Sequence, residues 1–128
     1  MNEALISVVE EYGTLKRVVV DEFNKDWIDS ISFQFENGVL DLSVDLEYDT
    51  IRWAVQAQVV GESGSSGPFW SSLLSSKPAW IWLLENQRGY LDGIQIEFWL
   101  GNQRTLLQIA AETAQLKIYR LEQIVAAL

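Results

Sequence analysis

The side chains best equipped for chemistry in this chain are carboxylates, which gather in the run Asp45, Glu47 and Asp49. Paired carboxylates hydrolyse glycosidic bonds, and Asp and Glu oxygens also bind hard cations such as Ca²⁺. Alternate side chains of a strand lie about 7 Å apart, which is too far for three of them to ligate one ion without a bend. The sixth position of the run is Thr50 rather than the glycine of an EF-hand loop. The spacing therefore favours a solvated strand face, and we predict neither a metal nor a cofactor.

Histidine and cysteine are both absent from the 128 residues. This composition excludes zinc hydrolases, cysteine nucleophiles and Ser-His-Asp catalysis, because these chemistries depend on an imidazole or a thiolate. The glycine-rich stretch 61–67 is not followed by the Lys-Ser/Thr pair of a phosphate-binding loop. We therefore expect a non-enzymatic protein. A carboxylate-based hydrolase or small-ligand binder with a site near residues 61–92 is the alternative.

A second polar cluster, Asn86 to Gly93, comes directly before a predicted strand. Its glycines and its Asn and Asp side chains are typical of a turn, in which side-chain oxygens accept hydrogen bonds from the backbone. The alternative is a site for a small ligand or for a partner's backbone, formed by Arg88, Tyr90 and Asp92. The pattern favours the turn.

The net charge of −9 arises entirely in the first fifty residues, where twelve Asp and Glu meet three Lys and Arg. The rest of the chain carries six residues of each sign. A one-sided acidic surface favours a basic protein partner and repels nucleic acid. We predict that Glu36, Asp41, Asp45 and Glu47 form this acidic face and bind a basic protein, for example as a regulator that blocks a basic enzyme.

A β-hairpin predicted over residues 27–48 positions these carboxylates. Apolar and polar residues alternate on both sides of Asn37-Gly38, which is the strongest short-range hairpin signal in a sequence. With Asn37 and Gly38 as the turn, Phe33 pairs with Leu42, and the phenylalanines face the core while the acids face solvent. A shift by one residue would reverse every side chain, so the faces are well specified.

The remaining pattern predicts an α+β fold, built mainly from an antiparallel sheet of about five to seven strands with one or two short helices. Further strands are expected at 15–23 and 116–121, and a helix at 4–12 that ends before Gly13. Residues 78–86 suit a buried strand and equally a helix that begins at a proline.

The pattern of residues 29–42 returns at 92–109, with a longer turn at Gly101-Asn102-Gln103. This repeat suggests a duplicated hairpin, although two unrelated amphipathic hairpins would look alike. We expect one domain over 1–128, with possible halves 14–60 and 79–121 joined by a Gly/Ser-rich loop at 61–78. Only the first part of that loop should be mobile, because Phe69 and Trp70 favour packing of the second part against the sheet.

Most of the six tryptophans are expected in the core. Trp99 is different, because Phe98 and Leu100 occupy the apolar, core-facing positions of its strand. Trp99 is therefore expected on the opposite face, beside Gln95 and Glu97. Either the loop 61–78 covers Trp99, which we favour, or Trp99 lies in a homodimer interface.

No apolar run approaches the length of about 20 residues that crosses a bilayer, and the first four residues lack the positive region of a signal peptide. The absence of cysteine fits a reducing compartment. We expect a cytoplasmic protein with no membrane partner.

Three stretches of the sequence resemble a family of small uncharacterised bacterial proteins that is frequent in cyanobacteria. They are Asn86-Gln87-Arg88-Gly89-Tyr90-Leu91-Asp92-Gly93, the alternating run from Asp29 to Phe35, and Asp49-Thr50-Ile51. The resemblance covers most of the chain. It implies a bacterial cytoplasmic domain of unknown function, without a known activity, ligand or catalytic residue.

Overall fold

The computed structural model describes residues 2–24, 27–57, 64–65 and 67–121. Within these residues the elements are α1 (Glu3–Glu11), β1 (Leu15–Asn24), β2 (Trp27–Phe35), β3 (Gly38–Asp45), β4 (Thr50–Gln56), β5 (Gly64–Ser65), α2 (Pro68–Ser71), β6 (Lys77–Glu85), β7 (Leu91–Leu100), β8 (Gln103–Glu112) and β9 (Gln115–Leu121). The protein is thus mainly β, and the predicted class α+β is only approximate. Eight long strands and the two-residue β5 exceed the predicted five to seven.

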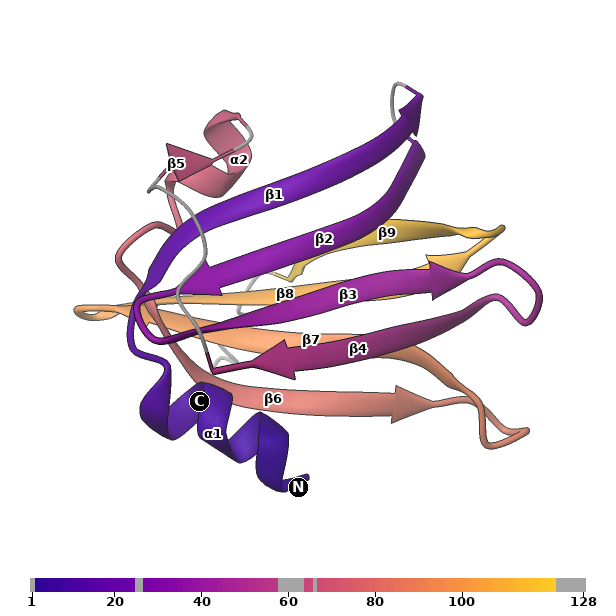
Figure 1. Ribbon diagram of the computed structural model, residues 1–128, viewed down its shortest axis with the longest axis horizontal. Helices are drawn as coiled ribbons and strands as arrows, with labels where there is room; N and C mark the ends of the chain where they lie inside the picture. The colour runs from indigo at the N-terminus through magenta and orange to yellow at the C-terminus, as the bar shows by residue number, and fades with distance from the viewer. Residues whose placement is uncertain (1, 25–26, 58–63, 66, 122–128) are drawn as a thin grey trace, which may run out of the picture.

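Two antiparallel meanders, β1–β4 and β6–β9, form one continuous sheet that curves into a half-barrel (Figure 1). They join where β2 meets β9, at the pair Ile28 and Leu116. β5 adds a short parallel pair beside β1. Each meander has the predicted hairpin at its centre, β2–β3 in the first and β7–β8 in the second.

The core lies between the two meanders. Phe33 of β2 contacts Phe98 of β7, with ring centroids 6.0 Å apart, and the buried side chains of both meanders belong to one cluster. Alternate residues of each strand supply it, as period-two patterning requires. Side chains of the opposite parity form the two outer faces of the sheet.

Two short helices pack against this sheet. In α1 the Asn2 side chain caps the first turn by accepting a hydrogen bond from the Ala4 N–H at 2.8 Å, while Leu5 and Val8 are buried. The helix packs against β6, β3 and β4 at the open side of the half-barrel (Figure 1), and it confirms the helix predicted at 4–12. α2 buries Trp70, so the second part of the loop 61–78 does pack back. None of the helices in the described residues is long and apolar enough to cross a membrane.

The register of the β2–β3 hairpin differs by two residues from the prediction. Phe33 pairs with Leu40 rather than Leu42, and the turn is Glu36-Asn37 rather than Asn37-Gly38. A shift of two preserves the faces, so the phenylalanines still point inward. The cause is tertiary: the N–H groups of Glu36 and Asn37 donate to the carbonyls of Thr14 and Tyr12 at 3.1 and 2.9 Å.

The turn of the other hairpin, between β7 and β8, is shorter than predicted. Leu100 pairs with Gln103, which leaves Gly101 and Asn102 as a two-residue turn. Gly101 has a φ of +60°, at the turn position that a type II′ turn gives to glycine. The ambiguous segment 78–86 is the strand β6, and the strands predicted at 15–23 and 116–121 are confirmed as β1 and β9. Residues 58–63 and 66 lie outside the described part of the chain, and the predicted mobility of the first part of the loop 61–78 falls mostly on them.

Candidate interaction surface

The outer side of the second meander presents an unusual set of side chains. Strand register places Trp82, Gln95, Gln108 and Tyr119 side by side in one row across β6, β7, β8 and β9. Parallel rows lie on either side of it. We call this surface the aromatic face; its side chains are Lys77, Trp80, Trp82, Leu84, Gln95, Glu97, Trp99, Arg104, Leu106, Gln108, Ala110, Glu112, Lys117, Tyr119 and Leu121.

Large aromatic side chains on this face are open to solvent. Trp80 is 50% exposed, Trp82 40%, Trp99 38% and Tyr119 41%. Of the six tryptophans only Trp70 is buried, so the expectation that most of them lie in the core is wrong. Leaving apolar surface in water costs about 25 cal/mol per Å², and grouped exposed aromatics mark contact sites on proteins.

Contacts within the face hold these side chains in place. The Trp80 and Trp82 rings stack with centroids 6.3 Å apart, and the Arg104 guanidinium lies 4.4 Å from the Trp99 ring centroid. The Trp99 indole N–H donates to the Glu97 carboxylate. Such side chains lose little rotamer freedom on binding, which favours association.

The centre and the far end of the face are equally well connected. The Gln95 amide donates to the Gln108 side-chain oxygen at 2.7 Å, and the Tyr119 hydroxyl donates to the Glu112 carboxylate at 2.5 Å. This hydrogen bond, followed by desolvation, raises the pKa of Tyr119 above its ordinary value of 10.0. Tyr119 is therefore a neutral donor near pH 7.

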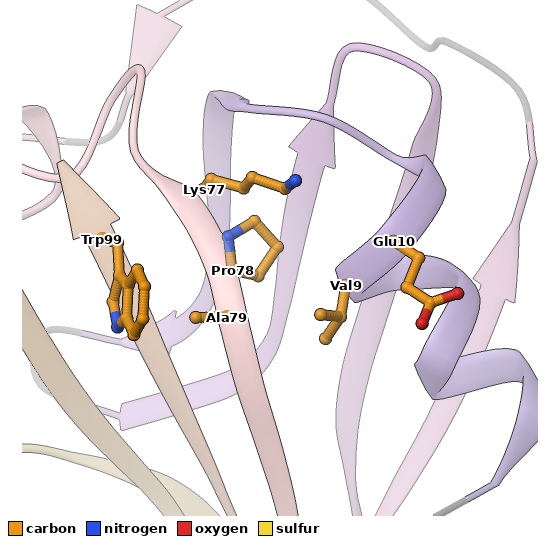
Figure 2. Close-up of a pocket in the computed structure, with 6 residues that line it drawn as sticks. All are labelled: Val9, Glu10, Lys77, Pro78, Ala79 and Trp99. Atoms are coloured by element: carbon orange, nitrogen blue, oxygen red, sulfur yellow. The ribbon is translucent and has the colours of Figure 1, made fainter. Parts of the chain in front are cut away.

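The face is hollowed where its strands carry small residues. Gly93 and Ala110 leave an open depression of about 370 Å³, whose polar lining comes from Asp92, Gln108, Glu112 and Tyr119. At the other end a second depression of about 330 Å³ lies between α1 and β6, where Figure 2 shows Val9 and Glu10 of α1 opposite Pro78 and Trp99. The aromatic face thus has a recess at each end.

Trp99 lies where parity placed it, on the face opposite the core. It remains 38% exposed, so the expected cover by the loop 61–78 is absent among the described residues. The described second part of that loop packs elsewhere, with Trp70 against Phe33 at 5.8 Å. The alternative, a homodimer interface at Trp99, stays a prediction.

The predicted acidic residues do not form one patch. Glu36 and Glu47 lie in the turns at opposite ends of β3, a strand of eight residues that spans about 26 Å. Asp41 is half-buried between them, opposite Ser32 and Ala54. Binding of a basic protein to these residues stays a prediction, and the four side chains are spread along the whole length of β3.

Asp45 serves the β3–β4 turn. Its carboxylate forms an ion pair with Arg52 at 2.7 Å and accepts hydrogen bonds from the N–H groups of Glu47 and Tyr48 at 3.0 and 3.3 Å. Desolvation acts to raise the pKa of Asp45, but the Arg52 bond and the two N–H donors outweigh it and lower the pKa below 3.8. The acid is thus occupied within its own hairpin.

Glu36 holds the chain entering β1. It accepts hydrogen bonds from the Thr14 N–H at 2.9 Å and the Thr14 hydroxyl at 2.7 Å, and these donors lower the pKa of Glu36 below 4.5. Because the folded pKa lies below the unfolded one, this stabilisation is complete above pH 4.5 and is lost as the pH falls through the folded value.

Glu36→Gln should therefore make the free energy of unfolding fall less steeply as the pH is lowered. Urea unfolding at a series of pH values measures this slope. Thr14→Val keeps the N–H donor, so its slope should lie between those of the unchanged protein and Glu36→Gln. An unchanged slope in Glu36→Gln would contradict this role.

Asp49 connects the two meanders. Its carboxylate accepts hydrogen bonds from the N–H groups of Thr113 and Ala114, at 3.1 and 2.8 Å, in the β8–β9 turn. We expect Asp49→Ala to lower the free energy of unfolding by about 0.5–1.5 kcal/mol, since two N–H donors of an exposed turn lose a charged acceptor. Asp49→Asn keeps one acceptor oxygen and tolerates the φ of 54°, so it should lose less stability. Thermal unfolding of both variants measures the two losses. Equal losses in the two variants would show that charge rather than hydrogen bonding matters.

The cluster 86–93 is a turn, as the favoured interpretation held. The Asn86 side-chain oxygen accepts hydrogen bonds from the N–H groups of Arg88 and Tyr90 at 2.9 and 3.2 Å, and Gly89 has a φ of +79°. Arg88 and Tyr90 are exposed on this turn, whereas Asp92 lies in the Gly93–Ala110 depression. The structure thus does not place the three candidate residues in one recess.

One observation supports the carboxylate-based alternative and another opposes it. Asp92 and Glu112 line the same depression. The acid of a carboxylate pair lies in an apolar pocket shielded from water, whereas Glu112 is exposed. Among the described residues no three Asp or Glu side chains are grouped so as to hold a metal ion. A hydrolase or small-ligand function near residues 61–92 stays a prediction.

The chain belongs to a family of unknown function, DUF6334, whose model matches residues 1–125. No curated protein and no solved structure matches it. The family match extends through both meanders and therefore includes every strand of the aromatic face.

Proposed function

We propose that this member of a family of unknown function is a non-enzymatic protein-interaction domain whose contact surface is the aromatic face. The observation that carries the proposal is the exposure of Trp80, Trp82, Trp99 and Tyr119 on one side of one sheet. Tryptophan, tyrosine and arginine are the side chains that dominate binding energy at protein interfaces. A cytoplasmic location and a bacterial source fit this function and belong to the same proposal.

The face combines exposed aromatic side chains with charged ones. Trp80 and Trp82 lie on β6, an edge strand of the sheet, and Leu106 lies on β8, while charged Lys77, Arg104, Glu112 and Lys117 lie toward the strand ends. Tryptophan, tyrosine and arginine side chains are enriched at protein contacts. Among the described residues, the strands β1–β4 carry none of the exposed large apolar side chains, so their outer face lacks this combination.

A photoreactive amino acid placed at the edge of the face tests the surface in living cells. At Lys117 and at Leu121, both on β9, it should form covalent adducts with a binding partner. Leu46 is the matched control, because it is 69% exposed but lies in the β3–β4 turn. Adducts at 117 and 121 that disappear with Trp82→Glu support the proposal. Adducts at 46 alone would place the contact at the acidic hairpin and overturn it.

Replacing Trp80 and Trp82 together separates an effect on binding from an effect on folding. Trp80→Ser with Trp82→Ser removes exposed side chains, so we expect the free energy of unfolding to change by less than about 1 kcal/mol. The same variant should lose the adducts at 117 and 121. Chemical denaturation followed by circular dichroism provides the stability measurement. A large loss of stability would show that the two rings support the fold rather than a contact.

A further inference from the structure

We infer that the partner of the aromatic face is a second copy of this chain, docked face to face about a two-fold axis that runs across the strands along the row Trp82, Gln95, Gln108 and Tyr119. This inference rests on the proposed function and names its partner. In such an isologous contact each residue meets the residue equally far along its own strand on the other side of the axis. The aromatic face is complementary to itself under that operation in shape and in charge.

The shape argument comes from the rows beside the axis. On one side of it lies the row Trp80, Glu97, Leu106 and Leu121, and on the other side the row Leu84, Gly93, Ala110 and Lys117, whose side chains are small on β7 and β8. The two-fold axis brings Glu97 and Leu106 of each copy onto Gly93 and Ala110 of the other. The depression of about 370 Å³ at Gly93 and Ala110 is then filled by Leu106 and its neighbours. Two equal recesses are filled at once, so the packing gain is doubled.

The charge argument comes from the ends of β8. Arg104 and Glu112 lie four residues to either side of Gln108, which is about 13 Å in each direction along the strand. The axis therefore places Arg104 of one copy against Glu112 of the second copy, and this pair occurs twice. Opposite charges meet at both ends without any change in the fold.

The distribution of net charge favours this face over the other. The surplus of nine negative charges arises in residues 1–50, while residues 51–128 are balanced. Docking through β6–β9 keeps the two acidic halves apart on the outside of the dimer. Docking through β1–β4 would bring them together, where repulsion is strongest.

A charge-swap experiment tests the pairing directly. Arg104→Glu alone places two like-charged pairs at the interface, and so does Glu112→Arg alone. We expect each variant to dimerise about tenfold more weakly than the unchanged protein in sedimentation equilibrium. An equal mixture of the two variants forms opposite-charged pairs at both ends, so its mixed dimer should recover to within about threefold of the unchanged protein. Failure of the mixture to recover would overturn the pairing.

Cross-linking through an introduced cysteine locates the two-fold axis. Because the chain has no native cysteine, only the introduced thiol reacts. Gln108→Cys lies on the axis, so a short bis-maleimide should join two copies through this position, since packed sheets are about 10 Å apart. Ala54→Cys on the outer face of β4 is the matched control and should remain uncross-linked. Joining at 54 but not at 108 would overturn the inference.

The outcomes also separate this inference from the proposed function. A protein that stays monomeric at high micromolar concentration, with adducts at 117 and 121 in cells of a mass other than twice the chain, overturns self-association and leaves the contact surface in place. No adducts at either position removes both. A concentration-dependent dimer that Trp82→Glu dissociates supports both.

Discussion

Trp70→Ala is expected to lower the free energy of unfolding by about 3–5 kcal/mol. Trp70 is 4% exposed, and its ring meets Phe33 edge to face at 5.8 Å. Removing it leaves a cavity between α2 and β2 that the neighbouring side chains fill only in part. Domains of this size are stable by about 5–15 kcal/mol, so the loss is a large share of the total. Urea unfolding followed by circular dichroism measures it.

The adjacent residue is the matched control for this prediction. Phe69 meets the Trp70 ring edge to face, with centroids 4.8 Å apart, but is 41% exposed, so Phe69→Ala should cost less than about 1.5 kcal/mol. A similar loss in both variants would show that α2 stabilises the fold as a unit. A negligible loss for Trp70→Ala would show that the core closes without this segment.

Alternation in the sequence predicts which side of a strand faces the core, and at the hairpins it does so correctly. It does not predict register, because Phe33 pairs equally well in kind with Leu40 or with Leu42. The choice is made by Tyr12 and Thr14, whose backbone carbonyls accept hydrogen bonds from the β2–β3 turn. A contact between residues more than twenty positions apart is invisible to a local pattern.

The aromatic face was predictable only at Trp99, where the parity of β7 is clear. In β6 every residue from Pro78 to Leu84 is apolar or aromatic, so no parity separates the buried Ile81 from the exposed Trp80 and Trp82. Pairing with β7 settles the question, because Trp82 shares its row with Gln95. The surface therefore depends on register across four strands, which a single sequence does not specify.

The acidic residues show the opposite problem. Their clustering in the sequence suggests a shared face, yet Glu36, Asp45 and Asp49 each accept hydrogen bonds from backbone N–H groups at turns. Turns leave such donors unpaired, and carboxylates are strong acceptors for them. Three of the twelve acids in residues 1–50 thus stabilise connections between strands. The grouped exposed aromatic side chains lie instead on the second meander.

Gly38→Ala is expected to be among the most damaging small substitutions in the chain. A Cβ atom at this position would lie 2.4 Å from two atoms of the Tyr12 ring, far closer than any real contact. Tyr12 is 4% exposed and packs on Phe35 with ring centroids 6.3 Å apart, so it has no free space into which to move. Overpacking of this kind costs about 1–3 kcal/mol and more where the neighbour is fixed, and we expect about 3 kcal/mol or more by urea unfolding.

A double-mutant cycle with Tyr12→Ala tests whether the ring is the cause. Gly38 is outside the left-handed φ region, so alanine suits its backbone once the ring is gone. In the Tyr12→Ala background, Gly38→Ala should therefore be neutral or slightly stabilising, because alanine reduces the entropy of the unfolded chain. An undiminished loss would mean that the glycine is needed by the β2–β3 turn itself. Close packing against the Tyr12 ring would then not be the reason for a glycine at this position.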